Sequence, residues 1–306
     1  TDTNPPLIDH MSVHGATAGV DAIFNAIIID DQTTTPQFSN PADGGVEYAK
    51  LYYGLTSPTS FVNATNVEGN LFKFTVPSAD VPASGSSFTY YIVAQDRATP
   101  TQKIKYFCAN PNPTSTNDCN TAPFVVNVVA AGARTVSGTV NQNTPGGTVA
   151  LAGAQVFVGG YAKASVATAG NGSYTISGLP NNDAFDFVAY KVGKSKNSRF
   201  ETIGTGNLTG INMNLNDGES GYASGAATGG DVSPHITFSG PPDNANGVPV
   251  AERIRVGISA PLNASTVKDT DASNAGSNVY LTTTGNDKIA GSVVYCANQS
   301  SAGCSA

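Results

Sequence analysis

The chain has 306 residues, with 15 Lys and Arg, 22 Asp and Glu, a formal net charge of −7 and no Trp. Charged residues make up 12 % of the sequence, about half of what is usual for a soluble protein. So few charges disfavour a helical protein, whose exposed faces need ionised side chains, and the thinly spread basic residues disfavour a nucleic-acid partner. A hydrophobic fraction of 40 %, with 13 Phe and 12 Tyr, argues against a disordered chain.

The length of the chain indicates two or three domains. Its apolar stretches fall short of the ~20 residues that a membrane-spanning helix needs. The first residues, TDTNPP, contain neither a starting Met nor the basic and apolar regions of a signal peptide. We therefore expect that a leader has been removed or that the chain begins downstream of one.

Five apolar runs in residues 1–131 predict strands that are separated by Pro, Gly, Asn and Asp clusters. They lie at 22–30, 46–53, 70–76, 87–94 and 124–129. Alternation at 50–53 and 71–74 predicts one face of each strand turned toward a core. The order of these segments, from AGVDAIFNAIIIDD through VEYAKLYYG to PFVVNV, resembles the fibronectin type III-like and immunoglobulin-like repeats of secreted bacterial proteins. The resemblance implies a β-sandwich and is almost uninformative about activity.

A second unit is predicted over residues 132–217. SGTV at 137–140 is followed by AGA at 152–154, which precedes a strand, and then by GSYTISGLP at 172–180. This order resembles the carboxypeptidase regulatory-like sandwich, also called transthyretin-like or prealbumin-like. In metallocarboxypeptidases that module is an appendage to the catalytic domain, and nothing in this sequence resembles the catalytic zinc ligands.

Residues 218–231, GESGYASGAATGGD, have the composition of a flexible linker. The remaining segment, 232–306, contains PPDNANGVP, IRVGIS and STV in that order and resembles another bacterial immunoglobulin-like family. A domain of this kind needs about 100 residues, so either the chain is a piece of a longer protein or a neighbour donates the missing strand. The sequence thus predicts an all-β protein of three tandem β-sandwich modules, immunoglobulin-like or prealbumin-like, with the third incomplete.

The four cysteines form two close couples. Turn-forming residues separate Cys108 from Cys119 and Cys296 from Cys304. Neither couple has the spacing of a zinc site or a nearby His. We therefore predict two disulfides that each close a small loop, with free thiols as the alternative. Paired cysteines indicate an oxidising compartment.

Asp30, Asp31 and Asp96 are the best candidates for a metal site. In the predicted sandwich, the strands that end in IIIDD and IVAQD finish at the same pole, where these carboxylates would share a Ca²⁺ ion. The alternative is structural: Asp96 pairs with Arg97 or Lys103 or caps a turn, while the other two carboxylates open a loop. No other cofactor is indicated.

Residues suited to catalysis are scarce. The histidines, His10, His14 and His235, are interpreted as surface residues of strands and loops, and no Ser lies in a nucleophile-elbow motif. We therefore expect no enzyme activity. A sugar-binding platform has little support, because Trp is absent and the outward ring of the couples Tyr52–Tyr53 and Tyr90–Tyr91 would pack against neighbouring strands.

Asn-x-Ser/Thr sequons are possible glycosylation sites. They begin at Asn63, Asn171, Asn207, Asn263 and Asn298. Several of these arise by chance in a chain so rich in Asn, Ser and Thr, and they matter only in an organism that modifies such sites.

The favoured function is structural: a secreted or cell-surface protein that forms a subunit or segment of a fibre, sheath, surface layer or adhesive stalk. Tandem sandwiches would build a rod, and low charge would let copies pack closely, so the expected partner is another copy or another surface or filament protein. The alternative is an accessory region of a larger secreted hydrolase, non-catalytic or glycan-binding. A free-standing ligand- or glycan-binding module is a third hypothesis. No nucleic-acid partner and no membrane span are expected.

Overall fold

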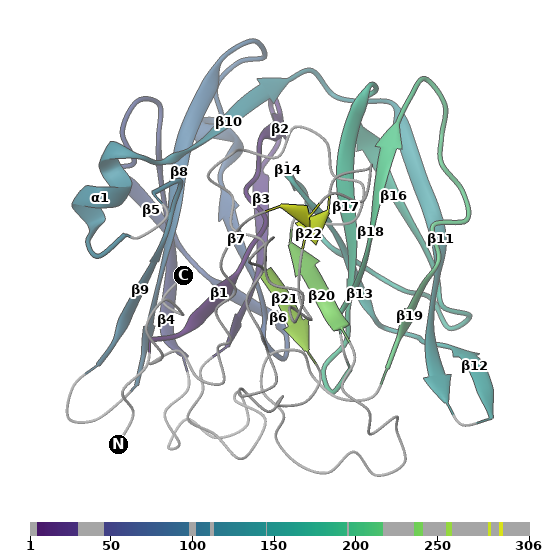
Figure 1. Ribbon diagram of the computed structural model, residues 1–306. Coiled ribbons are helices and arrows are strands. Elements are labelled where there is room, and N and C mark those ends of the chain that lie inside the picture. Colours follow the sequence, from purple (N-terminus) through teal and green to yellow (C-terminus); the bar gives the residue numbers. More distant parts are fainter. Residues whose placement is uncertain are drawn as a thin grey trace.

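The computed structural model describes residues 5–29, 46–97, 102–110, 113–144, 146–194 and 196–216, together with four short strands further along the chain. These four are β20 (Ile236–Gly240), β21 (Arg255–Ile258), β22 (Leu281–Thr282) and β23 (Lys288–Ile289). The expected linker at 218–231 and the rest of the third module lie outside the described residues. The described chain is almost entirely β-structure (Figure 1), so the predicted all-β fold class is confirmed.

Residues 7–129 contribute to two sheets. Sheet I contains β2 (Gly15–Thr17), β10 (Phe124–Val129), β8 (Ser87–Asp96), β4 (Val46–Gly54) and β5 (Ser60–Asn63) in that spatial order, with β9 (Ile104–Phe107) also paired to β8. Sheet II has the order β1 (Leu7–Asp9), β3 (Ala22–Ile29), β7 (Leu71–Val76) and β6 (Thr65–Glu68). A 3-10 turn, η1 (Ser78–Asp80), and one helix, α1 (Thr116–Thr121), lie in the connections.

Residues 134–215 contribute two further sheets. Sheet III has the order β15 (Val166–Ala167), β13 (Gln155–Gly159), β17 (Asp183–Tyr190) and β18 (Asn197–Ile203). Sheet IV contains β12 (Gly147–Ala150), β11 (Arg134–Thr144) and β16 (Ser173–Leu179), with β19 (Met213–Leu215) parallel to β11. One short strand, β14 (Tyr161–Ala162), leaves this group and pairs in parallel with β2 of sheet I.

Each pair of sheets encloses its own hydrophobic core. Leu51 and Tyr53 of β4 lie in the core between sheets I and II, while Lys50 and Tyr52 occupy the opposite face, as the alternation predicted. The second core lies between sheets III and IV and includes Tyr174. The two clusters define two β-sandwiches, here called the first and the second sandwich.

A third apolar cluster joins the outer face of sheet II to the outer face of sheet III. The sheets therefore stack as four layers in the order I, II, III, IV, which Figure 1 shows from left to right. The first two sandwiches lie face to face rather than end to end, so the rod expected from tandem modules is wrong for this part of the chain.

Strand β3 shows why this packing follows from the sequence. Its residues AIFNAIII are apolar almost throughout, and seven of the eight are buried. Phe24 and Ile28 enter the first core, whereas Ile27 and Ile29 face the second sandwich. A strand with both faces covered has no polar side, which is why it lacks the alternation of a half-exposed strand.

Candidate functional site

The junction between the two sandwiches is the most elaborate site in the described chain. Its apolar part combines residues of β3, β7, β13 and β17, all of them buried: Ile27, Ile29, Leu71, Phe157, Val188 and Tyr190. The hydroxyl of Tyr190 also accepts a hydrogen bond from the backbone N–H of Asn70 at 2.9 Å. The burial of this cluster contributes a hydrophobic free energy that neither sandwich would have alone.

Backbone pairing reinforces the junction. The carbonyl of Gly160 accepts a hydrogen bond from the backbone N–H of His14 at 2.9 Å. Next to this bond, β2 and β14 pair in parallel. Thr17 and Tyr161 share a side-chain hydrogen bond of 2.8 Å. At Gly159 a Cβ atom would lie 2.4 Å from Sδ of Met11, so any larger residue requires the Met11 side chain to move.

Charged and polar side chains also cross the junction. Lys191 lies 2.7 Å from Glu68, and Lys196 lies 2.5 Å from Asp9. The amide nitrogen of Asn25 donates to the backbone carbonyl of Lys163 at 2.7 Å. These contacts fix the lateral register of two apolar faces, which the hydrophobic cluster by itself would leave free to slide.

Asp186 is the buried acid of this junction. It lies on β17 and is 5 % exposed. Burial raises its pKa to about 6, while the charge of Lys196 and a hydrogen bond with Ser198 oppose the rise. Among the described residues, nothing forms a hydrogen bond with its Oδ1 atom. A carboxyl in this setting holds its proton more strongly than an exposed one.

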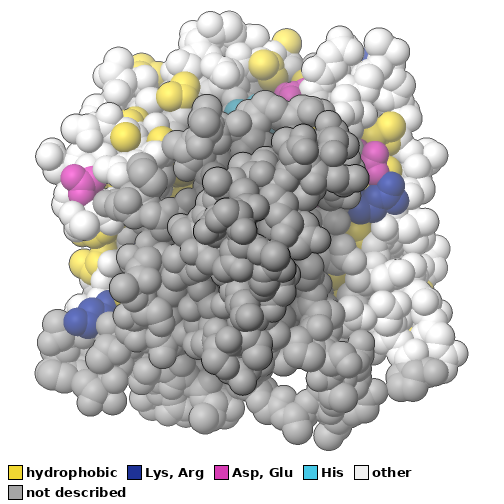
Figure 2. Space-filling view, in the orientation of Figure 1, with side chains coloured by type: hydrophobic (Ala, Val, Ile, Leu, Met, Phe, Trp, Pro, Cys, Tyr) yellow, Lys and Arg dark blue, Asp and Glu magenta, His cyan; other side chains and the backbone are white. Residues whose placement is uncertain are grey.

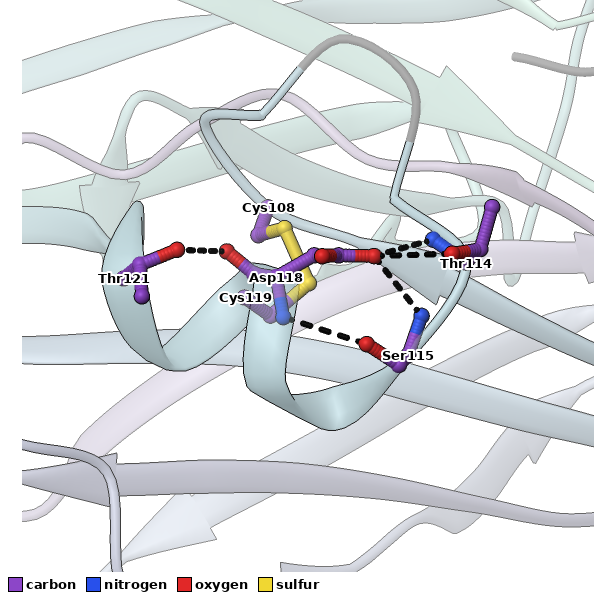
Figure 3. The surroundings of a disulfide bond; sticks show 6 residues. All are labelled: Cys108, Thr114, Ser115, Asp118, Cys119 and Thr121. Atoms are coloured by element: carbon purple, nitrogen blue, oxygen red, sulfur yellow. Dashed lines mark hydrogen bonds between the residues drawn. A yellow bond between two sulfur atoms is a disulfide. The ribbon is translucent and has the colours of Figure 1, made fainter.

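Cys108 and Cys119 form the first of the two predicted disulfides, and their Cα atoms are 5.4 Å apart. Cys119 lies on α1, which the sequence analysis took for a turn (Figure 3). Ser115 caps this helix by accepting from the N–H of Asp118, whose carboxylate accepts in return from the N–H of Ser115. Hydrogen bonds from Thr114 lower the pKa of Asp118. The second couple, Cys296 and Cys304, lies outside the described residues.

Removal of this disulfide is expected to lower stability without changing the fold. In the double variant Cys108→Ser and Cys119→Ser, the free energy of unfolding should fall by about 2 to 3 kcal/mol, because only a short loop regains its freedom in the unfolded chain. Urea unfolding with and without the bond measures the difference. An unchanged unfolding midpoint would show that the bond does not restrain the loop.

Of the three carboxylates in the calcium hypothesis, Asp96 is the one that lies in the described chain. Asp96 is fully buried, and its Oδ1 accepts the backbone N–H of Lys103 at 2.8 Å, which matches the structural alternative of a turn-capping residue. Asp30 and Asp31 lie outside the described residues, so a shared calcium site stays a prediction. No group of three or more potential metal ligands occurs within the described part of the chain.

The interpretation of His10 as a surface residue is wrong. It is buried, and its ring forms hydrogen bonds with the hydroxyl of Tyr90 and the backbone carbonyl of Asn25, each at 2.8 Å. The Tyr90 hydroxyl also accepts a hydrogen bond from the backbone N–H of Val13 at 2.7 Å. His10 and Tyr90 together therefore hold the N-terminal segment against the core. His14 is exposed and lies 3.3 Å from Asp183. His235 lies outside the described residues.

The outer face of sheet I carries an aromatic surface, made of Tyr48, Lys50, Tyr52, Phe61 and Tyr91. The rings of Tyr52 and Tyr91 stack at 4.9 Å, and the ammonium of Lys50 lies 4.7 Å from the ring centre of Phe61. Burial raises the pKa of Tyr91 to about 12. Phe61 is 49 % exposed, whereas Tyr90, on the opposite face, is in the core. Cross-strand packing, the interpretation favoured from the sequence, therefore accounts for most of these rings.

Three of the five sequons lie in the described chain. Asn63, Asn171 and Asn207 are all exposed. The side-chain oxygen of Asn171 accepts from the N–H and hydroxyl of Ser173, so its loop is held in a turn. Asn263 and Asn298 lie outside the described residues. Glycosylation at all five stays a prediction.

The sequence analysis singled out none of the residues that build the junction. One signal was available: Leu71 shares with Lys73 the face that alternation assigns to solvent. An apolar residue on such a face suggests cover by another element. The sequence offers no comparable signal for the pairing of Lys196 with Asp9.

No family model and no curated protein matches the chain. Among solved structures, the Bacillus anthracis TIE protein is 12 % identical, with 71 % of this chain and 42 % of that chain covered and a TM-score of 0.23. The chain thus spans less than half of that protein. The major pilin subunit BcpA of Bacillus cereus is 10 % identical over 69 % of this chain and 70 % of its own, with a TM-score of 0.23.

The minor pilin of Streptococcus agalactiae is 13 % identical over 60 % of this chain and 87 % of its own, again with a TM-score of 0.23. TM-scores this low establish no common topology. The fold is therefore defined by the strand order and burial of the chain itself. In the described residues, no helix has the length and apolar character required to cross a membrane.

Proposed function

We propose that this protein is a non-catalytic, extracellular structural component: a subunit or segment of a surface fibre, sheath, surface layer or adhesive stalk. The observation that carries the proposal is the junction, where apolar packing, strand pairing and ion pairs join two sandwiches into one four-layer block. Domains that meet through so many contacts resist relative motion. A load-bearing block needs this property, whereas a flexible tether between binding modules does not.

The surface supports the same proposal. Figure 2 shows that charged side chains are few and scattered over the described part of the visible face. A surface of uncharged polar groups lets copies of the protein approach without strong mutual repulsion. The proposed partner is therefore another copy of the chain or another surface protein.

The proposed organisation keeps the modules expected from the sequence. Residues 1–131 form the fibronectin type III-like or immunoglobulin-like module, and residues 132–217 form the carboxypeptidase regulatory-like module. Residues 218–231 form the linker to the incomplete immunoglobulin-like module at 232–306. The strand β14 of the second module completes sheet I of the first, so the first two modules act as one unit.

Electron microscopy of the purified full chain tests the structural function. Regular filaments, sheets or end-to-end chains are expected over a range of protein concentrations, with a repeat set by the four-layer block. A monodisperse monomer under all conditions, together with no incorporation into surface structures of the source cells, would contradict the proposal.

The aromatic surface of sheet I favours a second candidate, an accessory glycan-binding region of a larger secreted hydrolase. The exposed ring of Phe61 is able to stack on a sugar face, and the Lys50 ammonium beside it is able to donate to a sugar hydroxyl group. A glycan array with the wild-type chain and Phe61→Ala separates the candidates. Binding that Phe61→Ala abolishes would favour the accessory region, whereas an array without any binding would remove its support.

A further inference from the structure

The outer face of sheet IV carries ordered rows of small polar side chains. Strand β11 has Val136 and Val140 in the second core, so the residues that alternate with them face outward. These outward residues are Thr135, Ser137, Thr139, Asn141 and Asn143. All five are uncharged, and each side chain is able both to donate and to accept hydrogen bonds.

The strands on both sides of β11 continue this pattern. On β16, Ser173, Thr175 and Ser177 alternate with buried residues and pair with the first three outward residues of β11. On the other side of β11, Asn212 and Asn214 alternate with the buried residues of β19. The outward side chains of β11, β16 and β19 are here called the neutral face. None of those described is charged, although the whole chain has a formal net charge of −7.

Hydrogen bonds across the neutral face run in one direction, from β11 to the neighbouring strand. The hydroxyl of Thr139 donates to Oδ1 of Asn212 at 3.0 Å, and the backbone N–H of Thr139 donates to the same oxygen at 2.9 Å. The amide nitrogen of Asn141 donates to Oδ1 of Asn214 at 3.4 Å and to the hydroxyl of Thr139 at 3.5 Å. For a further partner, Asn141 therefore retains its carbonyl oxygen, whereas Asn212 and Asn214 retain amide N–H groups. The neutral face thus has a column of acceptors on β11 beside a column of donors at β19.

We propose that the neutral face is an interface at which two copies of this protein pair face to face, an inference that rests on the proposed self-association. A two-fold axis that runs parallel to the strands, between β11 and β19, places the donor column of each copy over the acceptor column of the other. The interface is then isologous, because both copies contribute the same residues. A face with charges of one sign would repel its own copy, whereas the neutral face is complementary to itself.

The position of sheet IV favours a second copy as the partner. It is the last layer of the four-layer block, at the right of Figure 1, so a copy that docks there continues the stack with its own sheets in reverse order. The chain has 22 acidic and 15 basic residues, and copies that meet at the neutral face keep their like charges apart. Within the described residues, the neutral face has no aromatic side chain that a sugar ring would stack on.

The pairing is expected to be weak and reversible. Each uncharged hydrogen bond between copies replaces a bond to water, and little apolar area is buried. We therefore expect a dissociation constant between about 1 μM and about 1 mM. A two-fold pair is closed, so a longer assembly needs a further contact elsewhere on the block.

Sedimentation equilibrium of the full chain over this concentration range tests the pairing. The wild-type protein is expected to form dimers. Thr175→Lys places a cation on an exposed residue of the neutral face in both copies, so the dissociation constant should rise at least about 100-fold. Thr202→Lys is the matched control, because it makes the same change at an exposed residue of β18 in sheet III and should leave the dissociation constant unchanged. A wild-type protein that stays monomeric over the whole range would overturn the proposal.

A mixture of Thr175→Lys and Thr175→Glu tests whether the partner is a second copy. Each variant alone should stay monomeric at concentrations where wild type forms dimers. The mixture should form heterodimers, because opposite charges then meet across the interface. Circular dichroism of every variant establishes that it is folded. A mixture that stays monomeric, or equal dimerisation of Thr175→Lys and wild type, would overturn the neutral face as the interface.

The failure of this interface is distinguishable from the failure of the proposed function. Filaments that form equally from wild type and Thr175→Lys in electron microscopy would overturn the interface and leave the structural function intact. Dimers without any filament or sheet would support the interface and contradict that function. A monomeric wild-type protein that insoluble cellulose retains, with retention lost in Thr175→Lys, would assign the neutral face to a polysaccharide and overturn the pairing.

Discussion

Replacement of Tyr190 by Ala is expected to lower the free energy of unfolding by about 3 to 5 kcal/mol, the range for loss of a buried aromatic ring. The ring is 3 % exposed and fills the apolar cluster between sheets II and III. Its loss also leaves the backbone N–H of Asn70 without the hydroxyl that accepts it. Calorimetry should show one unfolding transition for residues 5–216 of the wild type and two separate transitions in the variant.

Two further variants serve as controls for Tyr190→Ala. Tyr190→Phe removes only the hydroxyl and should cost about 1 kcal/mol. Val192→Ala, two residues away at a side chain that is 41 % exposed, should change stability by less than about 0.5 kcal/mol. If Tyr190→Ala costs no more than Val192→Ala, the two sandwiches do not stabilise each other through this cluster.

Stability is expected to fall as pH rises from about 4 to about 6, because of Asp186. Its pKa is raised by burial from 3.8 to about 6 in the folded protein. In this window the folded state holds a proton that the unfolded state has released, so stability is complete below the ordinary pKa and decreases up to the raised one. The shift corresponds to a loss of about 3 kcal/mol.

Denaturant unfolding of wild type and Asp186→Asn at pH 4, 5, 6 and 7 measures this effect. The difference between the two proteins is the relevant quantity, because other acids, such as Asp118, have lowered pKa values and act in the opposite direction. Asn cannot ionise, so the stability of wild type relative to the variant should fall by about 3 kcal/mol between pH 4 and pH 7. A constant difference across the series would contradict the raised pKa of Asp186.

The strands of the first sandwich are largely predictable from the sequence. Residues 124–129 form β10 with the expected bounds, and the runs beginning at residues 22, 46 and 87 form β3, β4 and β8. Alternation at 50–53 assigned Leu51 to the core, because a half-exposed strand shows its buried face directly in the sequence. The loop-closing disulfide between Cys108 and Cys119 followed from spacing and turn-forming residues.

Other features depend on contacts that one-dimensional patterns do not contain. The helix α1 has six residues, fewer than an isolated helix needs in water, and it persists through its cap at Ser115 and the bond at Cys119. The local sequence around His10 is that of a loop, and its hydrogen-bond partner, Tyr90, lies 80 positions away in the sequence. Asp186 lies in β17 between Phe185 and Phe187, and this local sequence gives no sign that another sandwich covers the carboxylate.

The pairing of β2 with β14 affects how the chain must fold. Gly15 pairs with Asn127 of β10 within the first sandwich, but its partner on the other side, Tyr161 of β14, is synthesised later, so the β2 edge of sheet I stays open while the first sandwich leaves the ribosome. Until sheet III arrives, the outer face of sheet II also exposes Ile27, Ile29 and Leu71 to water. An open strand edge beside an apolar face is a template for association with other chains. The period between synthesis of the first and second sandwiches is therefore when this polypeptide most needs protection from aggregation.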